Sequence, residues 1–95
     1  ARADLAWRAQ LAARTFSDAG LEVSSPDGGV VSVTAPGPEQ AVAWAAACAA
    51  QGIAVGCFRP PSTPDTRSRL RLTINTGERR EDFVHALAVI VKEAP

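Results

Sequence analysis

Residues 56–73 read Gly-Cys-Phe-Arg-Pro-Pro-Ser-Thr-Pro-Asp-Thr-Arg-Ser-Arg-Leu-Arg-Leu-Thr, and the fold is organised around this stretch. It holds three of the chain's seven prolines and four of its ten basic residues, with one acid among them. The prolines restrict the backbone of a loop at 59–66. Beyond the loop, apolar residues at even positions alternate with Arg69 and Arg71 at odd positions, which predicts a half-buried strand over 69–74.

Outward from this strand, periodicity and turn residues predict the remaining elements. We expect helices over 3–19, 38–51 and 79–92, strands over 21–23, 30–34 and 53–57, and a turn at 24–29. Gly20 and Gly52 provide left-handed ends for the first two helices. Trp44 is the one bulky anchor of the second helix, whose other residues are mostly small. The order α-β-β-α-β-β-α predicts an α+β fold, a two-layer sandwich in which helices cover one face of a small, mostly antiparallel sheet.

Length and composition indicate a single globular domain over residues 1–95. The chain is 46% hydrophobic and 21% charged, and ten basic residues balance ten acidic ones. Zero net charge predicts no general attraction to nucleic acid or membranes, and no stretch approaches the ~20 apolar residues of a membrane span. Cys48 and Cys57 lack metal-ligand spacing and are interpreted as buried, reduced thiols, so we expect a cytoplasmic protein. The start at Ala1 without methionine is typical of a processed or excised fragment.

The sequence provides no recognisable set of catalytic, cofactor-binding or metal-ligating residues. His85 stands alone on the last predicted helix, the serines lack a basic partner at a recognisable spacing, and there is no glycine-rich phosphate loop. Lys92 is the single lysine and lies near the C-terminus, where we expect it to fray into solvent rather than be desolvated like a Schiff-base lysine. Glu78, Glu81 and Asp82 crowd a helix start, where the helix dipole explains them.

The alternating arginines allow two interpretations. A guanidinium fork binds a carboxylate through two charge-assisted hydrogen bonds, and a strand holds it rigidly. Alternatively, these arginines mark the solvent face of an edge strand. With Ala54 and Gly56 on the same bare face, the surface is expected to close against another domain.

The loop and strand resemble the C-terminal domain of the 8-amino-7-oxononanoate synthases, pyridoxal-phosphate enzymes of the α-oxoamine synthase group and of fold type I. The family pattern is an Arg-Pro-Pro-Thr-x-Pro loop, a short Gly-Thr turn and an Arg-Leu-Arg-[Leu/Ile]-Thr strand. The resemblance extends more weakly over the whole chain. Ser62 stands in place of the loop threonine, and residues 65–67 replace the glycine-containing turn.

The resemblance implies that the chain is the small domain of a larger, homodimeric enzyme whose large, cofactor-binding domain is absent here. That enzyme would condense L-alanine with pimeloyl-CoA or another pimeloyl thioester, with loss of carbon dioxide, in biotin biosynthesis. It implies that Arg71 binds the amino-acid carboxylate and that Ser62 contacts substrate, with Arg59 and Arg69 in supporting roles. The fragment alone is expected to be inactive and to bind no pyridoxal phosphate.

Three alternatives remain open from the residues. The first is another α-oxoamine synthase, such as one resembling glycine C-acetyltransferase. The second is a stand-alone ligand-binding α+β module. The third is nucleic-acid binding through Arg59, Arg67, Arg69 and Arg71, against which zero net charge and only five aromatic residues argue.

Overall fold

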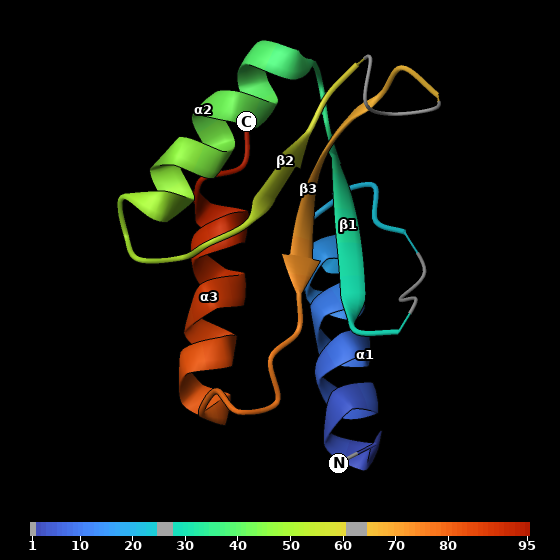
Figure 1. Cartoon of the computed structure of the whole chain (residues 1–95), viewed down its shortest axis with the longest axis vertical. Coiled ribbons are helices and arrows are strands. Elements are labelled where there is room, and N and C mark those ends of the chain that lie inside the picture. The colour runs from blue at the N-terminus through green and yellow to red at the C-terminus, as the bar shows by residue number, and fades with distance from the viewer. Residues whose placement is uncertain (1, 25–27, 61–64) are drawn as a thin grey trace.

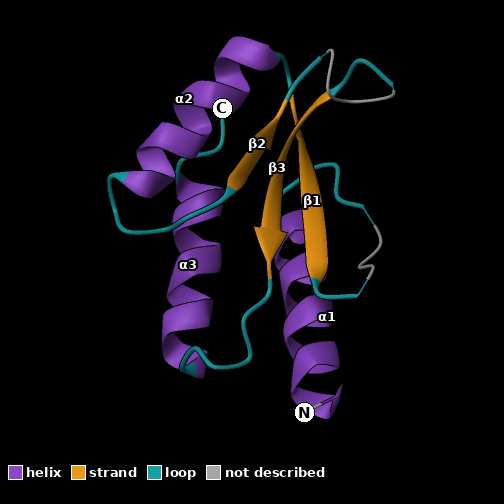
Figure 2. Ribbon diagram, in the orientation of Figure 1, coloured by secondary structure: helices purple, strands orange, loops and turns teal. Residues whose placement is uncertain are grey.

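The computed structural model describes residues 2–24, 28–60 and 65–95. Within these ranges the chain forms three helices and three strands (Figures 1 and 2). They follow in the order α1 (Arg2–Asp18), β1 (Val30–Ala35), α2 (Pro38–Ala49), β2 (Gly56–Phe58), β3 (Ser68–Thr73) and α3 (Arg80–Lys92). The predicted helices and the predicted central strand are therefore present, with bounds shifted by one or two residues.

The strand predicted at 21–23 was wrong. The N–H of Leu21 donates to the carbonyl of Phe16 (3.0 Å) and so still belongs to the end of α1. Only Val23 then forms a bridge, to Val33 of β1. Too few residues remain between the helix end and the next turn to build a ladder. The observed order is α-β-α-β-β-α.

The sheet confirms the antiparallel arrangement. Among the described residues its strand order is β1-β3-β2, and both neighbours run antiparallel to β3. The central β3 therefore presents Arg71 opposite Ser32 of β1 and opposite Gly56 of β2. Because side chains alternate along a strand, the leucines of β3 point to the side opposite the arginines.

The strand predicted at 53–57 is shorter and lies closer to the loop, since β2 spans only Gly56–Phe58. The N–H of Ile53 donates to the carbonyl of Cys48 (3.0 Å), which ties this residue to the end of α2. The segment 53–55 therefore crosses from the helix to the sheet instead of running along β3 (Figure 1). This divergence leaves space beside the central strand.

The core lies between the sheet and the helices, which Figure 1 shows together on one side of the sheet. The two-layer α+β class is thereby confirmed. Trp44 is 2% exposed, and its Nε1 donates to the carbonyl of Ile90 (2.9 Å), which links α2 to α3. The most deeply buried large side chains are Trp44, Phe16, Phe83, Leu70, Leu87, Ile90 and Val31. None of the described helices is long and apolar enough to cross a membrane.

A buried arginine joins α1 to the loop before α3, and the sequence pattern did not reveal it. Arg8 is 3% exposed. Its Nε donates to Asp4 (2.9 Å), and its terminal nitrogens donate to the carbonyls of Asn75 (3.1 Å) and Glu78 (2.5 Å). Its guanidinium also lies 5.2 Å from the centroid of the Phe83 ring. Arg8 thus donates three hydrogen bonds to acceptors within the fold.

Candidate carboxylate-binding site

The face of the sheet opposite the helices carries the predicted arginines. Arg71 and Thr73 of β3 are exposed and Arg69 is half-buried, whereas the intervening leucines are buried. Across this face the register places Gly56 beside Arg71 and Phe58 beside Arg69. The strand alternation was therefore predicted correctly, and it aims the guanidinium groups away from the core.

The arginines of this region differ in what they bind. Arg67 forms a bidentate ion pair with Glu22 (2.6 and 2.9 Å). Arg69 forms a bidentate ion pair with Asp65, one arm of which measures 2.9 Å. Arg71 has no ion pair with any residue in the described part of the chain. Of these three, it is the arginine left to bind an acid from outside.

The pair between Arg69 and Asp65 is electrostatically well matched. The hydrogen bond from Arg69 lowers the pKa of Asp65 well below its ordinary value, against a smaller opposing effect of desolvation. The same hydrogen bond raises the pKa of Arg69. Both groups are charged at neutral pH. Arg69 is therefore occupied by its ion pair with Asp65 at the end of the loop.

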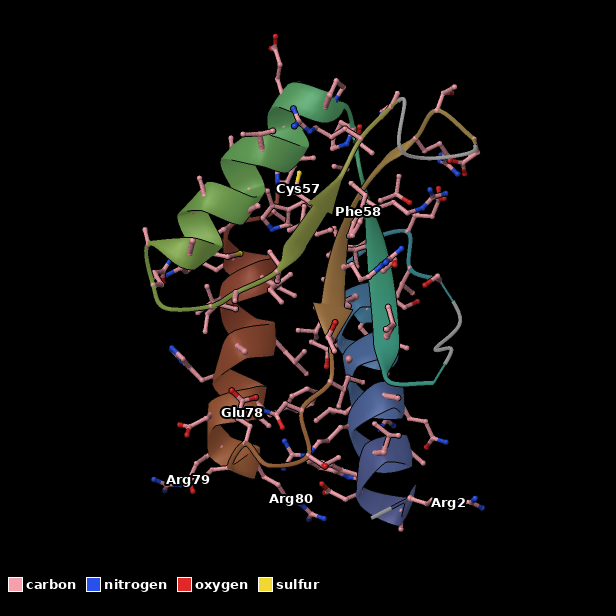
Figure 3. All side chains as sticks on the ribbon, in the orientation of Figure 1. Arg2, Cys57, Phe58, Glu78, Arg79 and Arg80 are labelled. Atoms are coloured by element: carbon pink, nitrogen blue, oxygen red, sulfur yellow. The ribbon has the colours of Figure 1, made fainter. Side chains whose placement is uncertain are left out.

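The guanidinium of Arg71 stacks on an aromatic ring. Its central carbon lies 4.1 Å from the centroid of the Phe58 ring. Figure 3 shows Phe58 extending over β3, whereas the preceding Cys57 lies toward α2. A Cβ atom at Gly56 would lie 2.8 Å from Cε2 of Phe58, so the missing side chain leaves the space that the ring occupies.

An open hollow of about 610 Å³ lies beside Arg71. It is formed where the segment 53–55 leaves β3, and it is lined by Ala54, Val55, Gly56, Arg71, Thr73, Ile74 and Asn75. Its lining includes one cation and no carboxylate. The small residues predicted to leave this face bare, Ala54 and Gly56, therefore border the guanidinium.

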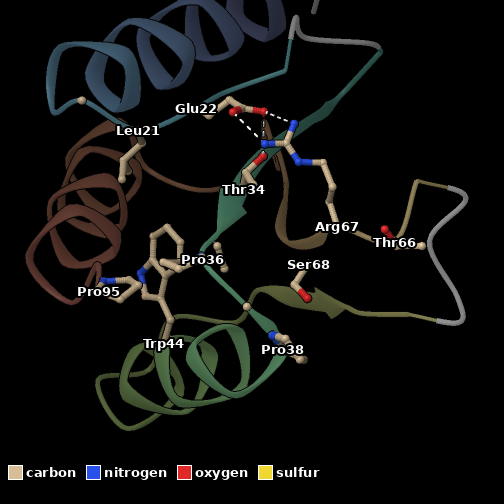
Figure 4. A pocket seen from close by; sticks show the side chains of 13 residues that line it. Leu21, Glu22, Thr34, Pro36, Pro38, Trp44, Thr66, Arg67, Ser68 and Pro95 are labelled. Carbon is tan, nitrogen blue, oxygen red and sulfur yellow. Dashed lines mark hydrogen bonds and ion pairs between the residues drawn. The ribbon is translucent and has the colours of Figure 1, made fainter.

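A second hollow, of about 520 Å³, lies at the end of β1, near the start of α2 and the start of β3 (Figure 4). Arg67 and Glu22 face one another there, and Thr34 Oγ1 donates weakly to the same carboxylate (3.4 Å). The positive charge in this hollow is thus already neutralised. Its chemistry favours an external acid less than the hollow at Arg71 does.

The other predicted substrate-binding residues are not gathered at Arg71. Arg59 is exposed and lines a separate hollow with α2 residues, among them Pro38 and Val42. Ser62 lies outside the described residues. Nothing in the sequence pattern singled out Phe58, although it shares the face of Gly56 two residues earlier.

The remaining titratable candidates occupy structural positions. Lys92 does not fray: it lies within α3, with its side chain exposed, and Nζ donates to Gln51 (2.9 Å). His85 is exposed on the same helix. Cys48 and Cys57 are free thiols, and burial raises the pKa of Cys48. The described residues contain no group of three or more side chains placed to hold a metal ion.

Residues 1–90 match the family described as aminotransferase class I and II. The chain belongs to this family. Among its relatives are two 8-amino-7-oxononanoate synthases. The one from Mycobacterium bovis (strain BCG / Pasteur 1173P2) is 56% identical over 57 residues, which cover 56% of this chain and 15% of the relative. The one from Mycobacterium sp. (strain JLS) is 49% identical over 65 residues, which cover 68% and 17%.

Solved structures share the fold. Serine palmitoyltransferase from Sphingomonas wittichii superposes with a TM-score of 0.87 at 22% identity, over 97% of this chain and 24% of that one. The 8-amino-7-oxononanoate synthase from Francisella tularensis gives a TM-score of 0.79 at 25% identity, over 97% and 27%. This chain therefore corresponds to about a quarter of the proteins whose fold it shares.

These similarities confirm the predicted fold and the wider aminotransferase family, whereas the narrower resemblance to the 8-amino-7-oxononanoate synthases stays a prediction. The chain spans about one sixth of the length of the curated relatives it matches. Its position within a larger enzyme and the roles of Arg71, Ser62, Arg59 and Arg69 stay predictions.

Proposed function

We propose that this chain is the substrate-carboxylate domain of an 8-amino-7-oxononanoate synthase. The whole enzyme would join L-alanine to a pimeloyl thioester, releasing carbon dioxide and the thiol and forming 8-amino-7-oxononanoate. The observation that carries the proposal is the guanidinium of Arg71, which has no ion pair within the described residues and lies beside an open hollow on the central strand. The relatives at 49–56% identity support the choice of reaction.

The chemistry of Arg71 fits a carboxylate. Its planar fork can donate two parallel hydrogen bonds to the two oxygens of one acid, whereas a lysine would offer a point charge. No acid within the described residues competes for it, in contrast to Arg67 and Arg69. A carboxylate bound here would hold the amino acid by the end that every α-amino acid shares.

The residues of this chain do not fit the site of a lysine-linked cofactor. A lysine that forms a Schiff base is activated by desolvation or by a neighbouring cation, whereas Lys92 is exposed and hydrogen-bonded to Gln51. We therefore assign pyridoxal phosphate, its lysine and the reacting atoms to the rest of the protein. A homodimeric cytoplasmic enzyme belongs to the same proposal.

We place the chain at the C-terminal end of that enzyme, as the loop and strand resemblance implies. Reading the gene on both sides of these residues tests the placement. A large domain with a cofactor lysine encoded upstream would support it, and one encoded downstream would overturn the placement but leave the role of Arg71 open. A gene that encodes little beyond these residues would favour a stand-alone binding module.

Steady-state kinetics of the whole enzyme test the role of Arg71. Arg71→Ala should lower kcat/KM for L-alanine by about 10- to 150-fold, equivalent to roughly 1.5–3 kcal/mol for a lost charged hydrogen-bonding partner. Arg71→Lys, which keeps the charge and loses the fork, should lie between that variant and the wild type. A kcat/KM for L-alanine close to wild type in both variants would show that Arg71 does not bind the carboxylate.

Another α-oxoamine synthase is the second candidate, because Arg71 recognises a carboxylate and not the side chain beside it. The two candidates separate in a substrate panel of L-alanine, glycine and L-serine, each with pimeloyl, acetyl and palmitoyl thioesters. Fastest turnover of L-alanine with the pimeloyl donor supports the first candidate. Preference for glycine or L-serine would replace it with the second.

A further inference from the structure

The stacking of Arg71 on Phe58 gives this arginine a fixed position without using its hydrogen-bond donors. An arginine held by an acid, as Arg69 is by Asp65, donates hydrogen bonds from two of its nitrogens to that acid. An arginine held by an aromatic face is attracted through the ring electrons instead. Its N–H donors lie in the guanidinium plane, and those of Arg71 take part in no ion pair within the described residues.

The geometry of the stack depends on three positions of two neighbouring strands. Arg71 lies directly opposite Gly56, and Phe58 is the next residue on the same face of β2. The ring therefore reaches diagonally across the strand pair, at a separation that aromatic side chains span. It lies 4.1 Å from the guanidinium carbon.

Gly56 makes this arrangement possible. A Cβ atom there would lie 2.8 Å from Cε2 of Phe58, which is too close for the ring in its present position. The backbone of Gly56 does not have a positive φ, so an alanine would fit the strand, and the closest contact of its Cβ would be with the ring.

We infer that Phe58, in the space left by Gly56, is a positioning residue that holds the Arg71 guanidinium ready for a substrate carboxylate. This inference rests on the proposed function and deepens it, because it names what keeps the carboxylate-binding group in place. A guanidinium already held in one orientation loses less conformational freedom when the acid binds. Removing the ring should therefore weaken binding of the amino acid while leaving the acyl thioester unaffected.

The test is a set of variants in the whole enzyme, with KM measured separately for L-alanine and for the thioester. Phe58→Leu should raise the KM for L-alanine by roughly 2- to 5-fold, the range that corresponds to one cation–π contact at an exposed site. Phe58→Tyr, which keeps the ring, should stay near wild type. Gly56→Ala should raise the KM for L-alanine about as much as Phe58→Leu does. The double variant should have a KM no higher than either single variant, because both changes remove the same contact between the ring and Arg71.

Trp7→Leu is the matched control. Trp7 lies against the guanidinium of Arg80 with a separation of 4.5 Å, and neither residue lines the hollow. Its loss should leave the KM for L-alanine unchanged. An equal rise in Trp7→Leu would mean that any lost stack has this effect, and the inference would be wrong.

The outcomes separate this inference from the function on which it rests. If Arg71→Ala leaves kcat/KM for L-alanine unchanged, the proposed function fails and the inference with it. If Arg71→Ala acts as expected but Phe58→Leu and Gly56→Ala match the wild type, only the inference is overturned. Fully additive effects of Gly56→Ala and Phe58→Leu would also overturn it, since the two would then act independently.

Discussion

In the described part of the chain two arginines lie against a phenylalanine ring, and they differ in burial and in hydrogen bonding. Arg8 is buried beside Phe83 and donates to one carboxylate and two backbone carbonyls. Arg71 is exposed over Phe58 and has no ion pair among residues 2–24, 28–60 and 65–95. The acceptors that the fold supplies decide whether an arginine stabilises the domain or remains available to a ligand.

The largest effect on stability is expected at Arg8. Arg8→Ala removes three hydrogen bonds from a residue that is 3% exposed, and two of these bonds connect α1 to the loop before α3. We expect a loss of roughly 2–4 kcal/mol in the free energy of unfolding, as for breaking a buried charged pair. Urea denaturation with a fixed slope measures this loss.

Arg14→Ala is the control for this change, because Arg14 lies on the same helix, is exposed and has no ion pair among the residues described. It should alter the free energy of unfolding by less than about 0.5 kcal/mol. Equal losses in the two variants would show that the buried contacts of Arg8 contribute nothing beyond the helix itself.

The same contrast explains what could be predicted from the sequence. The exposure of Arg71 follows from alternation within one strand, a pattern contained in six consecutive residues. The burial of Arg8 depends on carbonyls 67 and 70 residues away along the chain. No local periodicity carries that information, although Asp4 one helical turn earlier offers a partner.

In the candidate site, too, some features could be predicted from local sequence and others could not. The arginine strand and the bare glycine could be recognised from their spacing, whereas the contact between Phe58 and Arg71 depends on the register of β2 against β3. The predicted strand at 53–57 stopped before Phe58, which therefore belonged neither to that strand nor to the predicted loop at 59–66. Hydrogen bonding of Ile53 to the end of α2 shifted the strand toward the loop, a tertiary effect that strand propensity does not contain.

A smaller and pH-dependent effect is expected at Asp65. Arg69 lowers the pKa of this carboxyl in the folded chain. A lowered folded-state pKa gives a stabilisation that is complete above the unfolded value of about 3.9 and is lost as the pH falls toward the folded value. The difference in Tm between the wild type and Asp65→Asn should therefore be largest at neutral pH and shrink below pH ~4.

The partner variant checks the origin of this pH dependence. In an Arg69→Gln background, Asp65→Asn should change Tm little at any pH, because the ion pair is already lost. A difference that persists unchanged from neutral to strongly acidic pH would mean that Asp65 stabilises the loop as a hydrogen-bond acceptor and not through its charge.

The smallest effect on stability is expected at Arg71, where the effect on activity should be large. Its side chain is exposed, and the one contact that Arg71→Gln removes is the stack on Phe58, worth about 0.5–1 kcal/mol at an exposed site. Urea denaturation, carried out as for Arg8→Ala, should therefore give a loss below about 1 kcal/mol. A loss as large as that of Arg8→Ala would show that Arg71 stabilises the sheet. The contrast between Arg8, which stabilises the fold, and Arg71, which is available to a ligand, would then be wrong. A near-neutral change in the free energy of unfolding, together with impaired use of L-alanine, would mean that Arg71 contributes little to stability because its binding partner comes from outside the domain.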